Sequence, residues 1–560
     1  MLDTGINIIG AGLAGLSAAL LLSETGIPSR LISVQASERA QSNLAEGGIN
    51  AALDVMGEND TTEEHFADTM RGGVDLADPN MVRGLVEAAP EIVGMMERLG
   101  VPFHRENGRL IERNFGGQKK KRTAYAMSST GKVLTQALID AVRKYEAEGI
   151  VRRYPHHSFE RLAILDGPDG SVCAGVQVRE VYTQERFILE GPVIMASGGM
   201  NGMFRGATTG TTANTGSAAA QLFAQGVEFA NLEFLQYHPT TFSIPGKRLL
   251  ISEAARGEGG RLFCFRESGK KCYFLEDKYG EGGNLMPRDV ISREIALLDR
   301  PVFLDLTGLS RNVWENRLSD LREEIIHYKK TDPAKEPVPV SPGIHYFMGG
   351  ILVDEKHRTN VKDLYAAGEC ACAYHGANRL GGNSLLGAIY GGRTAAETAA
   401  ERYAAGENEQ SGRILSGASG RTAVRQEKRT VRQDKAEVFP YTPLCPEEKD
   451  ADEGLCKALL SGLSILRDEK SIGEALSLLE KSCRVADGKS GTSRISDELS
   501  ARKLLAKAML LSALSRRESR GAHTRKDFPE KDAAYRKTTV AAAKGDEIFI
   551  SMREIPGERK

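Results

Sequence analysis

The 560-residue sequence predicts an α/β fold with three parts: a parallel-sheet domain, an inserted α+β domain and a C-terminal helical domain. Three observations support this prediction. At the N-terminus a short apolar strand passes through a glycine-rich turn into an apolar helix. Similar apolar strands return near residues 193–199 and 360–369, with a long segment of different character between them. Residues 446–520 then carry leucines and alanines at helical spacing.

The N-terminal unit is typical of a Rossmann-like dinucleotide-binding domain. A strand is expected at residues 5–9, a helix at 16–22 and a second strand at 29–34, with Gly10-Ala11-Gly12-Leu13-Ala14-Gly15 as the first turn. Such glycines allow a tight turn and the close approach of a pyrophosphate, and the helix N-terminus supplies N–H donors. The acidic residue usual at the end of the second strand is missing, since Ser33-Val34-Gln35 stands there. The late strands, which end near Ala196-Ser197-Gly198 and at Gly368-Glu369, favour a long cofactor, FAD, over NAD.

The remaining parts follow from the interruption of this sheet. Residues 232–344 contain helical and loop patterns with several charged motifs, and they predict an inserted capping domain. The first domain then comprises residues 1–231 and 345–404, and ends in a helix from about residue 385 to 403. A stretch rich in Gly, Ser and charge at 405–425 predicts a linker, and residues 420–560 a helical domain with a tail.

Composition excludes several functions. A formal net charge of −1 offers no attraction to nucleic acid or an anionic membrane surface. No apolar run reaches the roughly 18 residues of a membrane helix, and no secretory signal is visible, so we expect a cytoplasmic protein. The eight cysteines are scattered without a C-x-x-C, and Cys370-Ala-Cys372 is too small a set for a zinc site or an iron–sulfur cluster. We therefore expect no metal, and electrons must come from elsewhere.

Five charged motifs between residues 238 and 384 predict the active site. They read His238-Pro239-Thr240, Glu253-Ala254-Ala255-Arg256-Gly257-Glu258-Gly259-Gly260, Pro287-Arg288-Asp289, His345-Tyr346-Phe347-Met348-Gly349-Gly350 and Ala377-Asn378-Arg379-Leu380-Gly381-Gly382-Asn383-Ser384. Two histidines and three arginines beside glycine-rich backbone can hold a small dianion and move a proton onto it. On a helix, the spacing of Glu253 and Arg256 places both on one face.

With these motifs the chain resembles the flavoprotein subunits of succinate dehydrogenases and fumarate reductases, over nearly its whole length. L-aspartate oxidase is a close relative of that family. The C-terminal Glu518-Ser519-Arg520-Gly521-Ala522-His523-Thr524-Arg525 also matches those subunits. The resemblance implies an FAD-binding Rossmann-like domain, a capping domain that covers the substrate, and a C-terminal helical domain.

The resemblance also implies roles for individual residues. The substrate, fumarate or succinate, would be bound by His238, Thr240, His345 and Arg379, with Phe115 beside it. Arg288 would give or take a proton through Glu253 and Arg256, while hydride passes between flavin N5 and the other olefinic carbon. The positions expected to bind FAD are Gly10, Gly12, Gly15, Ser33, Ser42, Gly47, Gly48, Ala196, Gly198, Glu369, Ser384 and Leu385.

Two departures from the family pattern refine this prediction. Membrane-bound members attach FAD to a histidine just before the Gly-Gly of the second motif, but Gln41-Ser42-Asn43-Leu44-Ala45-Glu46-Gly47-Gly48 contains none. We therefore expect non-covalent FAD, whose lower potential favours fumarate reduction. Thr215-Gly216-Ser217-Ala218 replaces the usual Thr-Gly-Asp-Gly and removes one polar contact near the flavin.

Alternatives remain at this point. Aspartate oxidase needs an acidic residue for the substrate ammonium, but the loop at 114–122 is basic and only Glu112 lies near it in sequence. A non-catalytic flavoprotein assembly subunit is a second alternative. Taken singly, each motif also has a structural interpretation. The histidines could be structural, and Arg288 with Asp289, or Glu253 with Arg256, could form exposed ion pairs. Residues 119–122 could form a solvated loop.

The expected partner is an iron–sulfur subunit, through which the chain would associate peripherally with the inner face of the cell membrane.

Overall fold

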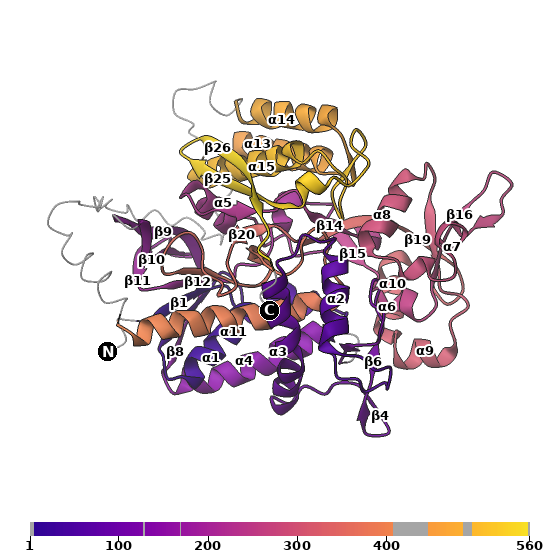
Figure 1. Ribbon diagram of the computed structural model, residues 1–560, viewed down its shortest axis with the longest axis horizontal. Helices are drawn as coiled ribbons and strands as arrows, with labels where there is room; N and C mark the ends of the chain where they lie inside the picture. The colour runs from indigo at the N-terminus through magenta and orange to yellow at the C-terminus, as the bar shows by residue number, and fades with distance from the viewer. Residues whose placement is uncertain (1–4, 127–128, 168–169, 407–445, 485–495, 558–560) are drawn as a thin grey trace.

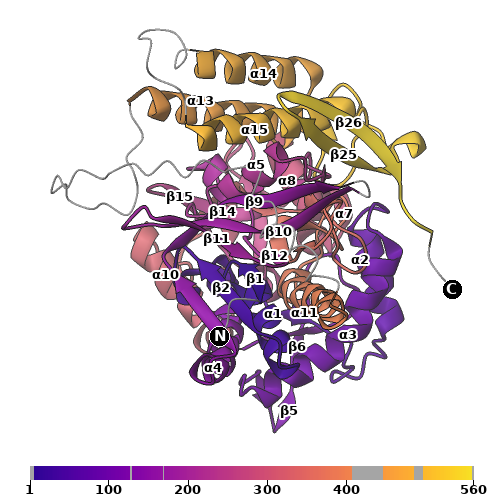
Figure 2. The ribbon, with the colours of Figure 1, turned by 90° about the vertical axis from the view of Figure 1, so that its left-hand side faces the viewer.

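The computed structural model describes residues 5–126, 129–167, 170–406, 446–484 and 496–557. The expected linker at 405–425 therefore lies almost wholly outside the described residues, as does Cys445. The other predicted regions can be followed in Figures 1 and 2.

A five-stranded parallel sheet forms the centre of the first part, in the order β21-β12-β1-β2-β8. Its strands are β1 (Ile6–Ile9), β2 (Ser29–Ser33), β8 (Val151–Pro155), β12 (Val193–Met195) and β21 (Leu364–Ala366). Every residue of β1 is buried, as expected for a central strand of a parallel sheet that is covered on both faces. The late strands β12 and β21 thus join the N-terminal βαβ unit, as the sequence predicted.

Helices and short strands surround this sheet. The long helix α11 (Asn383–Ala404) packs along α1 (Leu13–Glu24), and α4 (Thr130–Ala147) packs on the other side of α1, as Figure 2 shows. Peripheral elements are α2 (Thr62–Gly72), α3 (Pro79–Arg98), α5 (Ser217–Ala224), the antiparallel strands β9 (His157–Gly167), β10 (Gly170–Glu180) and β11 (Arg186–Glu190), and the short strands β3 (Ile49–Asn50), β4 (Arg105–Glu106), β5 (Arg109–Leu110), β6 (Glu112–Arg113) and β7 (Thr123–Ala124).

The inserted segment has its own six-stranded sheet and its own hydrophobic core. The strands, in sheet order, are β15 (Lys247–Leu250), β14 (Leu235–Ile244), β19 (Val338–Phe347), β18 (Val302–Asp305), β16 (Arg261–Phe265) and β17 (Lys271–Cys272). Its helices are α6 (Ala254–Gly257), α7 (Phe274–Tyr279), α8 (Arg288–Leu297), α9 (Arg311–Asn316) and α10 (Ser319–Lys329). The expected boundary between residues 344 and 345 falls inside β19, because a strand that pairs with β14 cannot leave the sheet at that point.

The C-terminal part contains the predicted helices and an unpredicted hairpin. Its helices are α13 (Pro446–Gly462), α14 (Glu469–Arg484) and α15 (Asp497–Ser515), and its hairpin is β25 (Lys537–Lys544) with β26 (Glu547–Glu554). The hairpin extends a sheet that also holds β13 (Phe229–Ala230), β20 (Gly350–Leu352) and β22 (Ala371–Cys372). A fully buried ion pair, Arg516 Nε to Glu233 Oε1 at 2.6 Å, fixes this part to the segment before β14.

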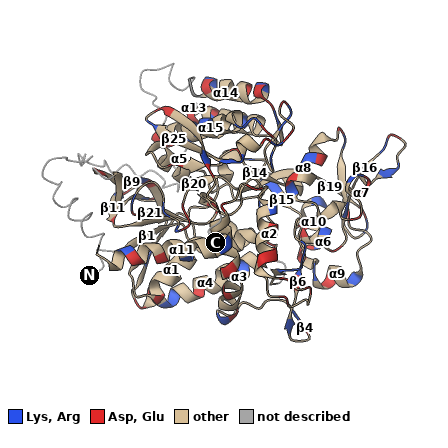
Figure 3. Cartoon of the chain, in the orientation of Figure 1, with Lys and Arg blue, Asp and Glu red and all other residues tan. Residues whose placement is uncertain are grey.

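Acidic and basic residues are both spread over the helices in Figure 3, in agreement with the small net charge. Within the described ranges, none of the helices has the length and apolar character needed to cross a bilayer.

Candidate active site

One large cavity, about 1610 Å³, runs from the glycine-rich turn to the charged motifs. Most of the positions expected to bind the cofactor lie on its wall. They are Gly10, Gly12, Ser33, Ser42, Gly47, Gly48, Ala196, Gly198, Glu369, Ser384 and Leu385. Gly15 lies behind the wall instead, where an added Cβ would come within 1.9 Å of the Gly10 carbonyl oxygen. Gly15 therefore allows the close contact of helix α1 with the strand and does not face the ligand.

The N-terminus of α1 fits a pyrophosphate. Its N-cap residue, Gly12, has no side chain to cap the first N–H groups, and a Cβ there would reach only Ser42 Oγ, at 3.4 Å, and the Ala40 side chain. Ser42 Oγ accepts from the Leu13 N–H at 3.2 Å and fixes the neighbouring loop against the turn. The N–H groups of the first helical turn and the helix dipole, at a cradle without a side chain on Gly12, suit a dinucleotide phosphate.

Replacing Gly12 by Val should weaken FAD binding by at least tenfold, because the branched side chain would occupy the phosphate cradle. The fold should persist, since the backbone of Gly12 has an extended conformation that valine adopts readily. Flavin fluorescence titration of the apoprotein would measure the affinity, with Gly308→Val as control, because Gly308 is exposed, has open space around it and lacks a left-handed backbone conformation. Unchanged FAD affinity in the Gly12 variant would contradict this placement of the pyrophosphate.

Glu369 provides a second contact on the same wall. It follows β21, and its Oε1 accepts from the Phe347 N–H at 3.2 Å. Burial raises the pKa of Glu369 to about 7, against the lowering effect of that hydrogen bond and of Arg379. A carboxyl group in this position can accept hydrogen bonds from cofactor hydroxyl groups.

Ser217, where the family pattern has an aspartate, also faces the cavity. Its Oγ lies 2.8 Å from Thr215 Oγ1 and donates to a carboxylate oxygen of Glu498 on α15. A carboxylate from the C-terminal helices thus lies beside the position that lost one. This contact could not be predicted from the sequence, because the two residues are far apart along the chain.

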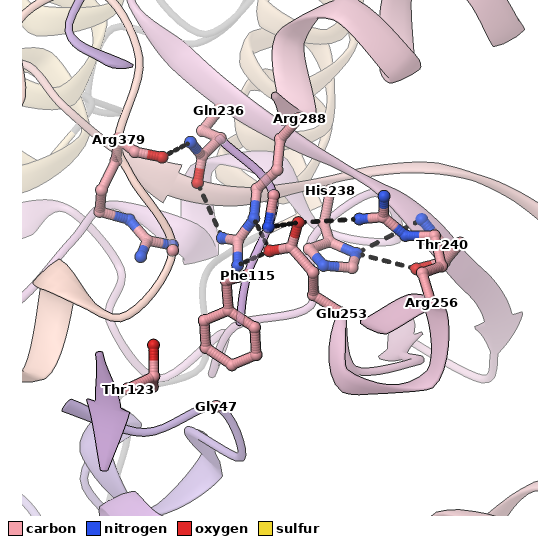
Figure 4. A network of polar contacts seen from close by, with 12 residues as sticks. Gly47, Phe115, Thr123, Gln236, His238, Thr240, Glu253, Arg256, Arg288 and Arg379 are labelled. Atoms are coloured by element: carbon pink, nitrogen blue, oxygen red, sulfur yellow. Dashed lines mark hydrogen bonds and ion pairs between the residues drawn. The ribbon is translucent and has the colours of Figure 1, made fainter. Parts of the chain in front are cut away.

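At the other end of the cavity, a chain of buried charges connects Arg288, Glu253 and Arg256 (Figure 4). Arg288 donates to Glu253 Oε2 from Nε at 2.9 Å and from Nη2 at 2.8 Å. The second oxygen, Oε1, accepts from Arg256 Nη2 at 3.1 Å and from the Gly116 N–H at 3.1 Å. Burial opposes ionisation of Glu253, but the charges of Arg288 and Arg256 outweigh burial and lower its pKa. One carboxylate therefore bridges two arginines, one on the cavity wall and one behind it.

The helical spacing of Glu253 and Arg256 is confirmed, because both lie at the short helix α6 and form an i,i+3 pair. The alternative of exposed ion pairs is wrong, since Glu253 and Arg256 are each only 2% exposed. Arg288 pairs with Glu253 and not with Asp289. Removing one member of such a buried pair costs far more than removing a surface ion pair.

His238 and His345 face each other where β14 and β19 become irregular. The pairing register between the two strands shifts after Gln236, which leaves His345 as an extra, unpaired residue on β19. A second irregularity follows His238 on β14. Bulges of this kind redirect side chains. The two imidazole rings lie 5.3 Å apart, and both line the cavity.

Both histidines are neutral. Burial, followed by the charge of Arg288, lowers the pKa of each well below 6.5. The Thr240 N–H donates to Nδ1 of His238 at 3.3 Å, so its proton is on Nε2, the nitrogen free to donate elsewhere. His345 Nδ1 lies 2.8 Å from Thr209 Oγ1. Thr240 is behind His238, where its hydroxyl donates to the Ile251 carbonyl, and it does not line the cavity.

The guanidinium groups of Arg379 and Arg288 point toward each other in Figure 4, and the Phe115 ring lies below Arg288. The guanidinium carbon of Arg379 is 4.3 Å from the centre of the Tyr346 ring, and the Arg379 Nε has no hydrogen-bond partner within the described part of the chain. Burial and the charge of Arg288 lower the pKa of Arg379 to about 9. A buried, under-compensated cation of this kind favours an anionic ligand.

Gln236 is a site residue that lies outside the five charged motifs. Its side chain is fully buried and contacts both Arg288 and the Arg379 backbone. The available signal was its position two residues before His238 on one strand, since alternate strand residues share a face.

The loop at 119–122 corrects one expectation. Arg122 is fully buried, not solvated, because Asp60 and Asp68 pair with its Nη2 at 2.8 and 3.1 Å. Glu112, the acid considered for a substrate ammonium, is 2% exposed and does not line the cavity. Burial, with the nearby Asp60 charge, raises the pKa of Glu112 to about 8.

Glu112 should make stability depend on pH. Because its folded pKa lies above its unfolded value of 4.5, its stabilising contribution is complete below pH 4.5 and is lost as the pH rises through about 8. Glu112→Gln should therefore unfold at higher urea concentration than the parent at pH 9, with the difference shrinking toward pH 6. Urea denaturation at both pH values measures this, with Glu106→Gln on exposed β4 as control. An equal difference at both pH values would argue against a protonated, buried Glu112.

The large cavity, the glycine-rich turn at one end of it and the arginine–carboxylate chain at the other together define a flavin-dependent oxidoreductase. Residues 6–385 match the FAD binding domain family, and residues 455–558 match the family described as fumarate reductase flavoprotein C-term. The chain belongs to the family of succinate dehydrogenase and fumarate reductase flavoprotein subunits, and its cofactor is FAD.

Relatives of several activities fall within this family. The chain is 37% identical to the succinate dehydrogenase flavoprotein subunit of Bacillus subtilis (strain 168), over 97% of this chain and 94% of that protein. It is 32% identical to the L-aspartate oxidase of Streptomyces coelicolor, over 94% and 89%. Among solved structures, a mutant of the E. coli quinol fumarate reductase subunit FrdA superimposes with a TM-score of 0.82 at 29% identity, over 98% of this chain and 96% of that one.

Proposed function

We propose that this protein is a fumarate reductase flavoprotein subunit, with residues 232–344 as the capping domain over its substrate. The observation that carries the proposal is the buried Arg288–Glu253–Arg256 chain, whose Arg288 lines the same cavity as Arg379 and faces it in Figure 4. This arrangement combines a held proton donor with an uncompensated cation, and the pair suits an unsaturated dicarboxylate.

Each side chain has a task in this proposal. Arg379 binds one carboxylate of fumarate through its planar fork, and neutral His238 and His345 donate hydrogen bonds to the dianion. FAD, when bound, supplies the hydride. Arg288 gives a proton to the neighbouring olefinic carbon, and Glu253 with Arg256 restores that proton. An arginine can act as the acid because the carbon becomes strongly basic as hydride arrives, so position matters more than pKa.

The direction and the electron source are also part of the proposal. No histidine lies between residues 41 and 48 to bind FAD covalently, and a free flavin with a lower potential favours reduction of fumarate. No cluster of three or more potential metal ligands occurs in the described ranges, so the electrons would come from a partner. We propose an iron–sulfur subunit as that partner and as the link to a membrane.

Anaerobic reoxidation of the dye-reduced, FAD-loaded protein by fumarate tests the function. Rapid reoxidation, with a rate well above dye-linked succinate oxidation, is the expected result. Faster succinate oxidation would show that the enzyme works as a succinate dehydrogenase, and no response to either acid would overturn the proposal.

Aspartate oxidase is kept as a second candidate because one acidic side chain lines the cavity next to Gly47. Burial, then the nearby Glu324 charge, raises the pKa of Glu46 to about 8, so it is largely protonated at neutral pH. A bound ammonium would favour its ionised form. Iminoaspartate formation that is lost in Glu46→Gln would support the oxidase, whereas fumarate turnover that survives this substitution supports the reductase.

A further inference from the structure

We infer that Gln236 is a positioning residue that sets the proton donor Arg288 against the carboxylate-binding Arg379. The inference rests on the proposed function and deepens it. Gln236 lies on β14 and is fully buried, and its amide contacts both halves of the site (Figure 4).

Its hydrogen bonds allow one orientation of the amide. Oε1 accepts from Arg288 Nη1 at 3.1 Å, and Nε2 donates to Asn378 Oδ1 at 2.8 Å and to the Arg379 carbonyl at 2.7 Å. A flipped amide would place NH₂ against a guanidinium and oxygen against two acceptors, so it is excluded. The side chain therefore acts as a rigid link of fixed polarity.

The link joins segments that are far apart along the chain. Arg288 begins α8 in the inserted segment, whereas Asn378 and Arg379 lie just before α11 in the parallel-sheet part. Among the described hydrogen bonds, Gln236 is the side chain that bonds both to the Arg288 guanidinium and to the loop that carries Arg379. If the two segments shift, Gln236 keeps the proton donor and the carboxylate clamp at a constant separation.

The Gln236 amide is also neutral, and this affects the acidity of Arg288. Arg288 already has one carboxylate partner, Glu253, on Nε and Nη2. An amide oxygen on Nη1 orients the guanidinium without adding negative charge. A carboxylate there would hold the proton on the guanidinium more tightly and make Arg288 a weaker acid.

Two substitutions test these functions separately. Gln236→Met keeps the volume and removes the link, and Gln236→Glu keeps the acceptor toward Arg288 but adds charge and loses the donors. We expect kcat for fumarate to fall roughly 10- to 100-fold in Gln236→Met, as for a misplaced catalytic group, with KM within about threefold. In Gln236→Glu, kcat should fall at least as much, and the alkaline limb of its pH profile should move to higher pH.

FAD content and a control separate positioning from folding. Both variants should retain FAD near one per chain, and Gln136→Met, an exposed glutamine on α4, should behave as the parent. A kcat within twofold of the parent, or a loss that only follows FAD content, would overturn the inference. An unshifted pH profile in Gln236→Glu would overturn the claim about charge. If the parent itself does not turn over fumarate, the proposed function fails and the inference fails with it, whereas an active parent beside unaffected variants overturns the inference alone.

Discussion

Arg288→Gln should lose fumarate turnover by about 10²–10⁴-fold while the protein keeps its FAD, since a positioned general acid contributes this much. Arg288 is the arginine on the cavity wall in contact with Glu253, and glutamine can keep a hydrogen bond to that carboxylate but cannot deliver the proton. The anaerobic reoxidation rate and the flavin absorbance of the same sample measure the two results together.

Loss of a buried charge also threatens folding, so the experiment needs two further variants. Arg288→Lys keeps the charge but cannot reproduce the contacts to both Glu253 and Gln236, and it should be about 10²-fold slow. Arg293→Gln, on the same helix with a side chain 34% exposed, should be unaffected. Full turnover by Arg288→Gln with normal FAD content would remove Arg288 from the proton path.

The second large effect concerns the anion clamp. Arg379→Lys should lower kcat/KM for fumarate by about 10²-fold or more, mostly through KM, because lysine cannot form two parallel hydrogen bonds to a carboxylate. The lysine variant also loses the planar contact that the Arg379 guanidinium makes with the Tyr346 ring, whose centre lies 4.3 Å from the guanidinium carbon. Initial rates over a range of fumarate concentrations separate KM from kcat.

A matched exchange is available for this test. Arg358→Lys alters an exposed arginine paired with Asp354 and should leave both constants unchanged. If Arg379→Lys lowers kcat alone and leaves KM as in the parent, Arg379 acts on the transition state without binding the substrate, and its assignment as the clamp is wrong.

The sequence predicted local features well. The glycine turn, the early and late strands and the C-terminal helices each depend on residues close together in the chain, where backbone geometry and apolar spacing decide the structure. The pairing of Glu253 with Arg256 could be predicted for the same reason. The boundary at 344/345 could not be placed, because pairing with β14, about a hundred residues earlier, keeps β19 in the inserted sheet.

The sequence by itself thus determined the fold class, the cofactor-binding turn and the set of residue types available to a dicarboxylate site. Only the tertiary structure decided which of these residues meet: Gln236 with both arginines, Ser217 with Glu498, and Arg122 with two buried aspartates. The physical reason is that burial and long-range packing set these charges and hydrogen bonds. An unpaired polar group costs free energy only when surrounding segments exclude water, and a linear pattern does not show which segments do so.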